Sequence, residues 1–421
     1  AIHPGYGFLS ENAEFASKCL NSGITFIGPS AEAIRLMGEK HKAKSVMEKA
    51  GVPIVPGYIG EEQSMQCLLK EADKIGYPLM IKAVLGGGGK GMRVVQEKED
   101  FVEALASVEN EARKAFGDSR VMLECFVKKP RHIEFQVLGD QHGNILHLFE
   151  RDCSVQRRHQ KIVEESPSLF FDNKIRGQMA DAAVLAAKTV KYTGAGTVEF
   201  IVGDDSSFYF MEMNTRLQVE HPVTEMITGL DLVELQLRIA AGEKLNMTQS
   251  KINKSGHAIE ARIYAENPAT GFLPSTGKLL KIAKPETIQL EQTQSQRAED
   301  LSSSSLRIDT GVEEGDNIGI NYDPMIAKMI VHADTRKNAI TAMQNALAQT
   351  AVIGVENNLG FLQSIFLDRD FEESQQNTLF VESKLDSLLE KENISRDWVS
   401  WASAISCILE DSAMAEKNTL N

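Results

Sequence analysis

Hydrophobic positions along this chain follow helical and strand periods in turn. Segments whose apolar residues recur every three or four positions are expected to be helices. Segments with apolar residues at every second position, or in short unbroken runs, are expected to be strands. The helical pattern covers residues 11–20, 31–50, 101–116, 178–191, 230–241, 339–349 and 397–409. The strand pattern covers residues 24–27, 77–84, 92–95, 121–127, 133–138, 145–150, 196–202, 208–213, 258–264 and 322–331.

This interleaving of helices and strands predicts a mixed α/β fold. Residues 121–150 are expected to form antiparallel strands, and residues 196–213 a hairpin. A second structural unit is expected to begin near His257. Within it, residues 289–305 are rich in Gln, Glu and Ser and have no apolar pattern, which is typical of a surface loop.

Composition narrows the class of function. The 421 residues are 42% hydrophobic and 25% charged, which is ordinary for a globular protein, and the net charge of −14 argues against general affinity for nucleic acid or anionic membranes. No apolar run reaches the roughly 18–20 residues that a membrane span needs. Five cysteines without paired spacing indicate free thiols in a reducing compartment, and not disulfides or a zinc site.

A glycine-rich loop, residues 86–91, carries five glycines around Lys90. Glycine costs backbone entropy, and the usual reason for so many is a loop whose N–H groups wrap phosphate oxygens. The loop is not a Walker A motif, since Met92 and Arg93 follow it, nor a dinucleotide fingerprint, since a strand follows it instead of a helix. A plain hairpin with a flexible tip is the alternative.

Two lysines are candidate phosphate ligands. Lys82 lies in an apolar strand just before the glycine loop, and Lys40 lies in the predicted helix 31–50. A buried lysine is costly unless it meets an anion, so Lys82 is the stronger of the two. The alternative for each is an amine that simply reaches solvent.

A candidate metal site lies in residues 212–229. If the preceding run 208–211 is a strand, Glu212, Asn214 and Arg216 share one face, because side chains alternate along a strand. Glu199 lies on the other arm of the predicted hairpin. Two glutamates opposite each other repel unless a cation lies between them, and Mg²⁺ prefers carboxylate and carbonyl oxygens. Surface acids at a strand end are the alternative.

Residues 150–161 end in a basic cluster. The candidates for a positive cup that holds an anionic substrate or phosphates are Gln156, Arg158, His159 and Lys161. Residues 128–132 are expected to form a similar basic turn. A single histidine such as His132 is usually structural. A solvated run of charges is the alternative for the basic cluster.

Taken in order, these motifs resemble the biotin carboxylase component of biotin-dependent carboxylases, which has the ATP-grasp fold. The resemblance covers about residues 1–370, and it is carried by residues 3–12, 86–92, 151–161, 212–229 and 322–325. It implies an α/β (α+β) fold in which the ATP-grasp fold is combined with the remnant of an N-terminal pre-ATP-grasp α/β domain and a C-terminal mixed α/β domain.

The same resemblance implies four units. They are the remnant of an N-terminal biotin carboxylase domain (1–38), the ATP-grasp domain (39–250), the biotin carboxylase C-terminal domain (251–370) and the start of a truncated interaction domain (371–421). We expect the chain to be a piece of a longer protein, because it opens without methionine inside a strand-to-loop segment and carries no Met-Lys-Met biotin-accepting segment.

A reaction is implied as well, in which ATP and bicarbonate carboxylate biotin and yield ADP and phosphate. Carried over by position, the ATP ligands are Lys40, Lys82, Gly87, Gly88, Gly89, Glu124 and His132, with Gln156 and His159 near the phosphates. The ligands of Mg²⁺ or Mn²⁺ are Glu199, Glu212 and Asn214. The bicarbonate ligands are Lys161, Arg216, Gln218 and Val219.

In this family's mechanism, Glu220 corresponds to the base that deprotonates bicarbonate, whose oxygen then attacks the γ-phosphate. The resulting carboxyphosphate breaks down to CO₂ and phosphate, and the phosphate takes the N1′ proton of biotin. Arg216 and Arg307 correspond to the groups that stabilise the biotin enolate. The implied catalytic residues are Arg216, Glu220, Lys161 and Arg307.

The implied partners are a biotin carrier domain absent from this chain and a carboxyltransferase (beta) subunit, in an oligomeric complex without nucleic acid or membrane. Residues 216–220 and 323–328 look most like the alpha subunits of 3-methylcrotonyl-CoA carboxylases, which implies the mitochondrial matrix. Propionyl-CoA, acetyl-CoA and pyruvate carboxylases share most of the pattern. Another ATP-grasp ligase, such as a carbamoyl-phosphate synthetase, and a non-catalytic assembly fragment are the alternatives.

Overall fold

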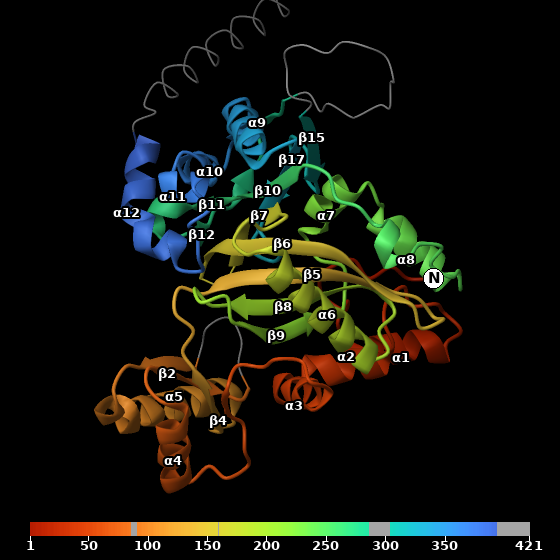
Figure 1. Cartoon of the computed structure of the whole chain (residues 1–421). Helices are drawn as coiled ribbons and strands as arrows, with labels where there is room; N and C mark the ends of the chain where they lie inside the picture. Colours follow the sequence, from red (N-terminus) through yellow and green to blue (C-terminus); the bar gives the residue numbers. More distant parts are fainter. Residues whose placement is uncertain (86–90, 159, 286–303, 394–421) are drawn as a thin grey trace, which may run out of the picture.

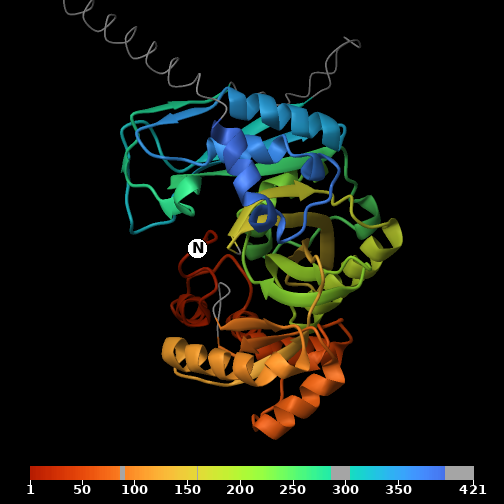
Figure 2. The same ribbon diagram turned by 90° about the vertical axis from the view of Figure 1, so that its left-hand side faces the viewer.

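The computed structural model describes residues 1–85, 91–158, 160–285 and 304–393. A large antiparallel sheet lies in the middle, a small lobe is built on a second sheet, and helices cover both (Figure 1). The view in Figure 2 shows the small lobe at one end of the molecule and the C-terminal helices at the other, with the large sheet between them. Of the described helices, none is long and apolar enough to cross a bilayer.

The N-terminal segment forms three short helices, α1 (Ala13–Asn21), α2 (Ala31–Gly38) and α3 (Lys40–Ala50). Two predictions are wrong here. Residues 24–27 contribute a single parallel bridge, between Ile2 and Phe26, instead of a strand. The predicted helix 31–50 is two helices, because Glu39 is extended (φ −98°, ψ 93°) directly after Gly38, and glycine is a poor residue for a helix interior.

A four-stranded antiparallel sheet with the order β1-β4-β2-β3 forms the small lobe. Its elements are β1 (Gly57–Tyr58), α4 (Met65–Ile75), β2 (Leu79–Ala83), β3 (Met92–Val95), α5 (Phe101–Phe116) and β4 (Val121–Cys125). Phe101, Leu105 and Val108 recur at helical spacing on α5 and are fully buried against β2. The helix predicted at 101–116 and the strand at 92–95 are confirmed, whereas residues 86–90 lie outside the described residues.

The large sheet has eight strands in the order β15-β17-β10-β7-β6-β5-β8-β9, and all neighbours are antiparallel. In that order they are β15 (Ser305–Thr310), β17 (Met325–Ala333), β10 (His257–Tyr264), β7 (Gln160–Ser166), β6 (Ile145–Arg157), β5 (Arg131–Gly139), β8 (Gly194–Val202) and β9 (Phe208–Asn214). The pairing of β7 with β10 places strands from both sides of residue 250 in one continuous sheet.

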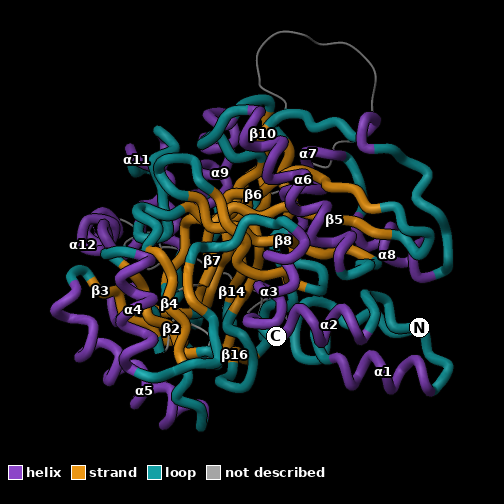
Figure 3. Tube along the Cα trace, turned by 60° about the horizontal axis from the view of Figure 1, so that its bottom comes forward, coloured by secondary structure: helices purple, strands orange, loops and turns teal. Residues whose placement is uncertain are grey.

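The two faces of this sheet differ in chemistry because side chains alternate along each strand. On β5, Ile133, Phe135 and Val137 point to an apolar face covered by α3 and α6 (Asn173–Thr189). At the far end of that face, α9 (Arg336–Ala348) and α10 (Leu359–Phe366) cover β10 and β17. The opposite, polar face is covered by α7 (His221–Thr228) and α8 (Leu232–Ala240). Figure 3 shows the strands gathered inside the surrounding helices.

The strands richest in charge are the ones that the hydrophobic pattern shortens or misses. β6 continues well beyond the predicted 145–150, and neither β7 nor β15 is predicted. The helices α4 and α7 are not predicted either. Arg131 and His132 begin β5 and are buried, so the predicted basic turn at 128–132 is wrong in its second half. Arg131 is accommodated because Asp152 on the neighbouring β6 lies 3.2 Å from its guanidinium.

Short elements complete the C-terminal part. They are β11 (Glu266–Asn267), β12 (Leu273–Pro274), β13 (Gly277–Lys278), β14 (Lys281–Ala283), β16 (Asn317–Ile318), β18 (Ala351–Ile353), α11 (Arg369–Glu372) and α12 (Phe380–Asn393). The predicted strand 322–331 corresponds to β17 and the predicted helix 339–349 to α9. The helix predicted at 397–409 lies outside the described residues.

Glu165 of β7 ties the sheet to its C-terminal helices. Its carboxylate accepts hydrogen bonds from Arg336 Nε (2.6 Å) and Gln376 Nε2 (2.6 Å) and lies 2.7 Å from His257 Nε2. Arg336 also donates to two backbone carbonyl oxygens of α11. Burial raises the pKa of Glu165, but Arg336 and His257 outweigh burial and lower this pKa to about 2.

We expect Arg336→Met to lower the free energy of unfolding by about 3–5 kcal/mol at pH 7, because Glu165 would stay buried without its main cation. A carboxyl with a depressed folded pKa stabilises the protein above its unfolded pKa of about 4.3 and loses this contribution as the pH falls through the folded pKa. The difference in the free energy of unfolding between wild type and variant should therefore become smaller below about pH 4. Urea unfolding followed by circular dichroism at pH 7 and pH 3 measures it.

The matched control for this experiment is Lys281→Met, which breaks the exposed ion pair with Glu314. This change is expected to leave the free energy of unfolding unaltered, since exposed ion pairs contribute little. A difference in the free energy of unfolding between wild type and Arg336→Met that is equally large at both pH values would contradict the assigned role of Glu165.

Candidate active site

Lys161 of β7 lies in the centre of the polar face, surrounded by three buried carboxylates. Its Nζ is 2.5 Å from Glu134 on β5, 2.7 Å from Glu220 before α7, and 3.0 Å from Glu199 on β8. Burial lowers the pKa of Lys161, but the carboxylates of Glu134, Glu199 and Glu220 outweigh burial and raise this pKa well above its ordinary value. Lys161 is therefore a permanent cation, and it allows three carboxyl groups to stay close together.

Two arginines add positive charge to this cluster. Arg262 of β10 places Nη2 2.8 Å from Glu220 Oε2 and 2.6 Å from Glu164 Oε1. Arg151 of β6 is fully buried and donates from Nε to Glu134 at 2.6 Å. Its other nitrogens donate to Gln136, Thr197 and Thr224. A buried carboxylate cluster needs such partners, because an unpaired buried charge is strongly destabilising.

Glu220 is held in its ionised form at the start of α7. Burial raises its pKa, but Lys161, Arg262 and Arg151 outweigh burial and hold this pKa well below its usual range. Each carboxylate oxygen meets one cation, Oε1 the amine of Lys161 and Oε2 the guanidinium of Arg262. A buried, ionised carboxylate of this kind can take a proton from a substrate that lies against it.

Glu199 and Glu212 are direct cross-strand partners on β8 and β9, as the sequence predicts. Glu199 accepts a hydrogen bond from Asn214 Nδ2 at 2.7 Å. Glu212 is partly exposed and pairs with Lys40 of α3 at 2.9 Å. Carboxylate and amide oxygens at one edge of the polar face are the donors that Mg²⁺ prefers, so these residues fit the predicted metal.

His132, Glu134 and Glu199 form a second group whose ligand atoms all lie within 4.8 Å of one another. His132 Nε2 is 3.0 Å from Glu199. Lys161 already contacts Glu134 and Glu199, so this group has a cation of its own. Burial lowers the pKa of His132, but the Glu199 carboxylate outweighs burial and raises this pKa.

Glu124 of β4 lies buried between two lysines at the junction with the small lobe. It pairs with Lys44 of α3 and with Lys82 of β2. Burial is the main reason that the pKa of Lys44 is lowered, while Glu124 opposes it. Two amines around one carboxylate leave a positive charge at this junction, which suits a polyphosphate.

The loop between β9 and α7 lies over the cluster. Arg216 Nε is 3.0 Å from Glu11, and its guanidinium donates to Gln218 Oε1 at 3.2 Å. The carbonyl oxygen of Val219 accepts a hydrogen bond from Lys328 Nζ of β17 at 2.7 Å. The loop is thus held between the N-terminal segment and the far end of the large sheet.

Some predicted site residues lie elsewhere or cannot be placed. Arg307 of β15 pairs with Glu225 at 2.7 Å and with Asp309 at 2.8 Å, so the structure does not place it in the Lys161 cluster. Gln156 lies beside its strand partner Lys161, but its amide donates to a backbone carbonyl. Of the predicted positive cup, Lys161 lies among carboxylates. Gly87, Gly88, Gly89 and His159 lie outside the described residues.

Sequence reasoning missed Glu134, Arg151, Lys44 and Arg262. For Arg262 a signal was present, since Glu260 and Arg262 are charged residues two positions apart in the otherwise apolar run 258–264. Charged residues at one phase of an apolar strand indicate a buried polar face. The partners of these charges lie on other strands and have no local signature.

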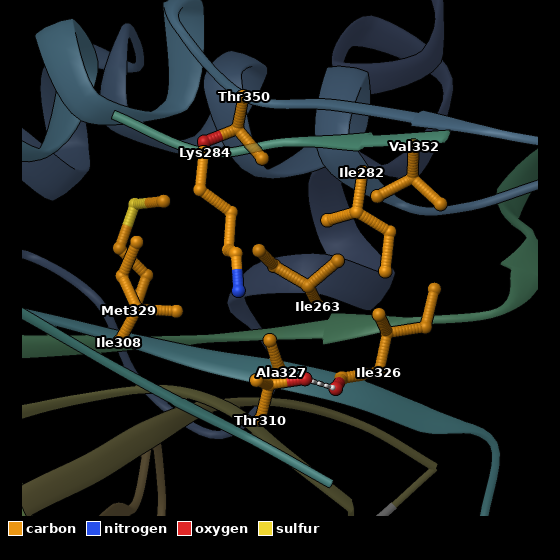
Figure 4. A pocket seen from close by; sticks show the side chains of 10 residues that line it. All are labelled: Ile263, Ile282, Lys284, Ile308, Thr310, Ile326, Ala327, Met329, Thr350 and Val352. Carbon is orange, nitrogen blue, oxygen red and sulfur yellow. Dashed lines mark hydrogen bonds between the residues drawn. The ribbon is translucent and has the colours of Figure 1, made fainter. Parts of the chain in front are cut away.

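One cavity lies apart from this cluster, in the C-terminal part (Figure 4). Its wall is almost entirely apolar, with Ile263, Ile308 and Val352 among the lining residues, and Thr310 donates across it to the carbonyl oxygen of Ile326 at 3.0 Å. The free space is no larger than a water molecule needs. Its polar lining residues are Lys284, Thr310 and Thr350, and so small a space is not a candidate for catalysis.

Three family models match the chain. They are the biotin carboxylase N-terminal domain over residues 1–34, the carbamoyl-phosphate synthase L chain ATP binding domain over 39–248, and the biotin carboxylase C-terminal domain over 260–383. A biotin carboxylase of Nostoc sp. is 48% identical over 382 residues, which cover 91% of this chain and 82% of that protein.

The chain is also similar to longer proteins and to solved structures. The mitochondrial methylcrotonoyl-CoA carboxylase subunit alpha of Dictyostelium discoideum is 52% identical, with 92% of this chain and 54% of the relative covered, so the chain spans about half of that relative. The biotin carboxylase domain dimer of Hydrogenobacter thermophilus 2-oxoglutarate carboxylase, in complex with MgADP, ADP and bicarbonate, is 44% identical with a TM-score of 0.82. That match covers 92% of this chain and 82% of the other.

This chain therefore belongs to the biotin carboxylase family of ATP-dependent ligases. The ATP-grasp fold and the family resemblance predicted from the sequence are confirmed.

We expect Lys161→Met to destabilise the protein by at least about 3 kcal/mol at pH 8, because three buried carboxylates would lose their shared cation. Lys161 lowers the pKa values of Glu199 and Glu220, whereas burial already raises the pKa of Glu134. Without Lys161 all three pKa values rise, so the variant gains stability as protons bind. The difference in thermal midpoint from wild type should be smaller at pH 5 than at pH 8. Calorimetry at both pH values measures this difference. An unchanged midpoint at pH 8 would rule out the shared-cation role.

Proposed function

We propose that this chain catalyses the ATP-dependent carboxylation of biotin by bicarbonate. The observation that carries the proposal is Glu220, an ionised buried carboxylate clamped between Lys161 and Arg262 beneath the loop that carries Arg216. These groups share the polar face of one sheet with the candidate metal ligands. Membership of the biotin carboxylase family supports the proposal, as does the relative solved with MgADP and bicarbonate.

In the proposed reaction Glu220 accepts the proton of bicarbonate, which is held by Lys161, Arg216, Gln218 and Val219. A bicarbonate oxygen then attacks the γ-phosphorus of ATP, and the bond from that phosphorus to the bridging oxygen of ADP breaks. Carboxyphosphate releases CO₂ and phosphate, and the phosphate removes the N1′ proton of biotin. The biotin nitrogen attacks CO₂ and becomes carboxybiotin. Fixed cations beside each developing negative charge lower the barrier.

We assign nucleotide binding to Lys40, Lys82, Glu124 and His132, with the glycine loop at Gly87–Gly89 over the phosphates and with Gln156 and His159 near them. Lys82 contacts Glu124 in the structure and lies on β2, the strand that precedes the glycine loop in the sequence. Glu199, Glu212 and Asn214 would hold Mg²⁺ or Mn²⁺. When bound, the ion neutralises negative charge on the transferring phosphates.

Stabilisation of the biotin enolate is assigned to Arg216 and to Arg307. The sequence resemblance points to Arg307 for the second role. However, Arg262 contacts Glu220, whereas Arg307 is paired with Glu225 and Asp309. We therefore assign Arg262 to holding Glu220 in its ionised form, and the enolate role stays with Arg307, which contacts Glu225 on α7.

For the whole protein we propose the alpha subunit of a 3-methylcrotonyl-CoA carboxylase in the mitochondrial matrix. It would act with a biotin carrier domain and a carboxyltransferase (beta) subunit in an oligomer. The mouse mitochondrial methylcrotonoyl-CoA carboxylase subunit alpha, 52% identical over 98% of this chain, supports this assignment. The propionyl-CoA carboxylase alpha chain of Ruegeria pomeroyi is 49% identical, so a propionyl-CoA carboxylase is the second candidate. Carboxylation assays of the full-length complex with each acyl-CoA separate the two.

We expect Glu220→Gln to lower biotin-stimulated release of phosphate from Mg·ATP and bicarbonate by about 10²-fold or more, because a positioned base contributes roughly this much. The KM for ATP should change little, since Glu220 is not assigned to the nucleotide. Steady-state phosphate assays with and without free biotin measure both constants.

The control for this assay is Glu234→Gln on α8, an exposed residue paired with Arg238 on the same helix. It should keep wild-type rates. Phosphate release from the wild type that does not respond to biotin would contradict the proposed reaction, and wild-type rates in Glu220→Gln would remove Glu220 as the base.

We expect Glu212→Gln to weaken stabilisation of the fold by Mg·ATP. A ligand that binds only the folded state raises the thermal midpoint, and losing one carboxylate ligand weakens the binding of a hard cation. Differential scanning fluorimetry with ATP and increasing Mg²⁺ measures the shift. Asp204→Asn, an exposed change in the turn between β8 and β9, is the control and should keep the wild-type shift. Equal shifts in both variants would remove Glu212 from the metal site.

A further inference from the structure

Two buried glutamates outside the set assigned above face each other across the joint of the large sheet. Glu164 of β7 and Glu260 of β10 are direct cross-strand partners, and both side chains are fully buried. Neither oxygen of Glu260 has a hydrogen-bond partner within the described chain, and the ion pair of Glu164 with Arg262 is the contact found for Glu164 there. Carboxyl groups buried in this way are costly, so a fold that keeps two of them side by side requires a reason.

Arg262 links Glu164 to the proposed base, Glu220. A single nitrogen, Nη2, lies 2.6 Å from Glu164 Oε1 and 2.8 Å from Glu220 Oε2. One guanidinium nitrogen is thus divided between the proposed base and a second carboxylate from a different strand. Glu260, in contrast, forms no ion pair with Arg262 among the described contacts, although it is Glu164's neighbour.

Resting on the proposed function, we infer that Glu164 is a positioning residue for proton transfer. Through the shared nitrogen of Arg262, its charge sets how tightly that cation holds Glu220 and so how readily Glu220 accepts a proton. When Glu164 is ionised it competes for Arg262, and Glu220 becomes the stronger base. When Glu164 is neutral, Arg262 is left to Glu220 alone, and the base is weaker.

The charge state of Glu164 is able to change near neutral pH. Burial raises its pKa to about 7, a rise that Glu220 adds to and Arg262 opposes. Burial also raises the pKa of Glu260 well above its ordinary value. The other charged or titratable groups that act on this pair and on its Arg262 contact are Lys161, Lys328, Cys153 and Tyr264.

A dependence of the rate on pH follows from this arrangement. Below about pH 7 Glu164 carries its proton and Glu220 is a weak base; above about pH 7 Glu164 is ionised and Glu220 is a stronger base. Biotin-stimulated phosphate release, measured at a fixed bicarbonate concentration, should therefore rise through about pH 7 in the wild type. The rise reports the ionisation of Glu164 and not that of Glu220 itself, whose pKa lies far lower.

The test compares kcat and the KM for bicarbonate between about pH 6 and pH 8.5 in the wild type, Glu164→Gln and Glu260→Gln. Glu260→Gln is the matched control, since it makes the same change at a neighbouring buried site without touching Arg262. We expect Glu164→Gln to lose the rise near pH 7 and to lower kcat roughly threefold to tenfold at pH 8, with KM unchanged. Glu260→Gln should keep the wild-type profile.

Four outcomes overturn the inference. The first is a pH profile of kcat in Glu164→Gln that matches the wild type, and the second is an equal fall in kcat in Glu260→Gln. The third is a change in the KM for bicarbonate with kcat unaltered, and the fourth is a wild-type rate that does not rise near pH 7. A wild type without biotin-stimulated release is a different result, because it overturns the proposed function first and the inference with it.

If Glu164→Gln does not fold, carbon-13 NMR of glutamate-labelled wild type decides the question. A buried glutamate carboxyl signal that titrates near pH 7, and that moves in folded Glu164→Asp, supports the inference. Absence of any glutamate titration between about pH 6 and pH 8 overturns it.

Discussion

The balance of buried charge around Lys161 is the constraint on which the rest of this structure depends. Three glutamates, Glu134, Glu199 and Glu220, meet one ammonium group on the polar face of an antiparallel sheet. Ionised groups are tolerated in such surroundings only when opposite charges are positioned to within hydrogen-bonding distance. The strand register, the short loop before α7 and the buried Arg151 all serve that positioning.

The same constraint explains why the large sheet does not stop at the boundary between the two units seen in the sequence. Arg262, which neutralises Glu220 from one side, arrives on β10, while Lys161 arrives on the neighbouring β7. A site divided between two separately moving units would have to rebuild its charge balance each time they moved. A continuous ladder of backbone hydrogen bonds keeps the two cations at a fixed spacing.

Local signals predicted those elements whose stability is local. Residues 101–116 form a helix with the predicted bounds because its apolar positions follow the helical period and pack on one sheet. Residues 31–50 share that period, yet the helix breaks at Glu39, directly after Gly38, because a periodic apolar pattern does not register the poor helix propensity of a glycine inside it. β7 was missed because its glutamates and lysine look like a solvated segment until their partners are known.

The sequence by itself determined the class of chemistry: a glycine loop, a basic cluster and paired glutamates, in an order that resembles the biotin carboxylase family. It also determined which residue types were available for each role. Only the tertiary structure decided that Lys161 stands among carboxylates, that Arg262 rather than Arg307 touches Glu220, and that Glu164 shares that arginine. The physical reason is that electrostatic interactions depend on distances between strands far apart in the chain, and a linear pattern carries no record of those distances.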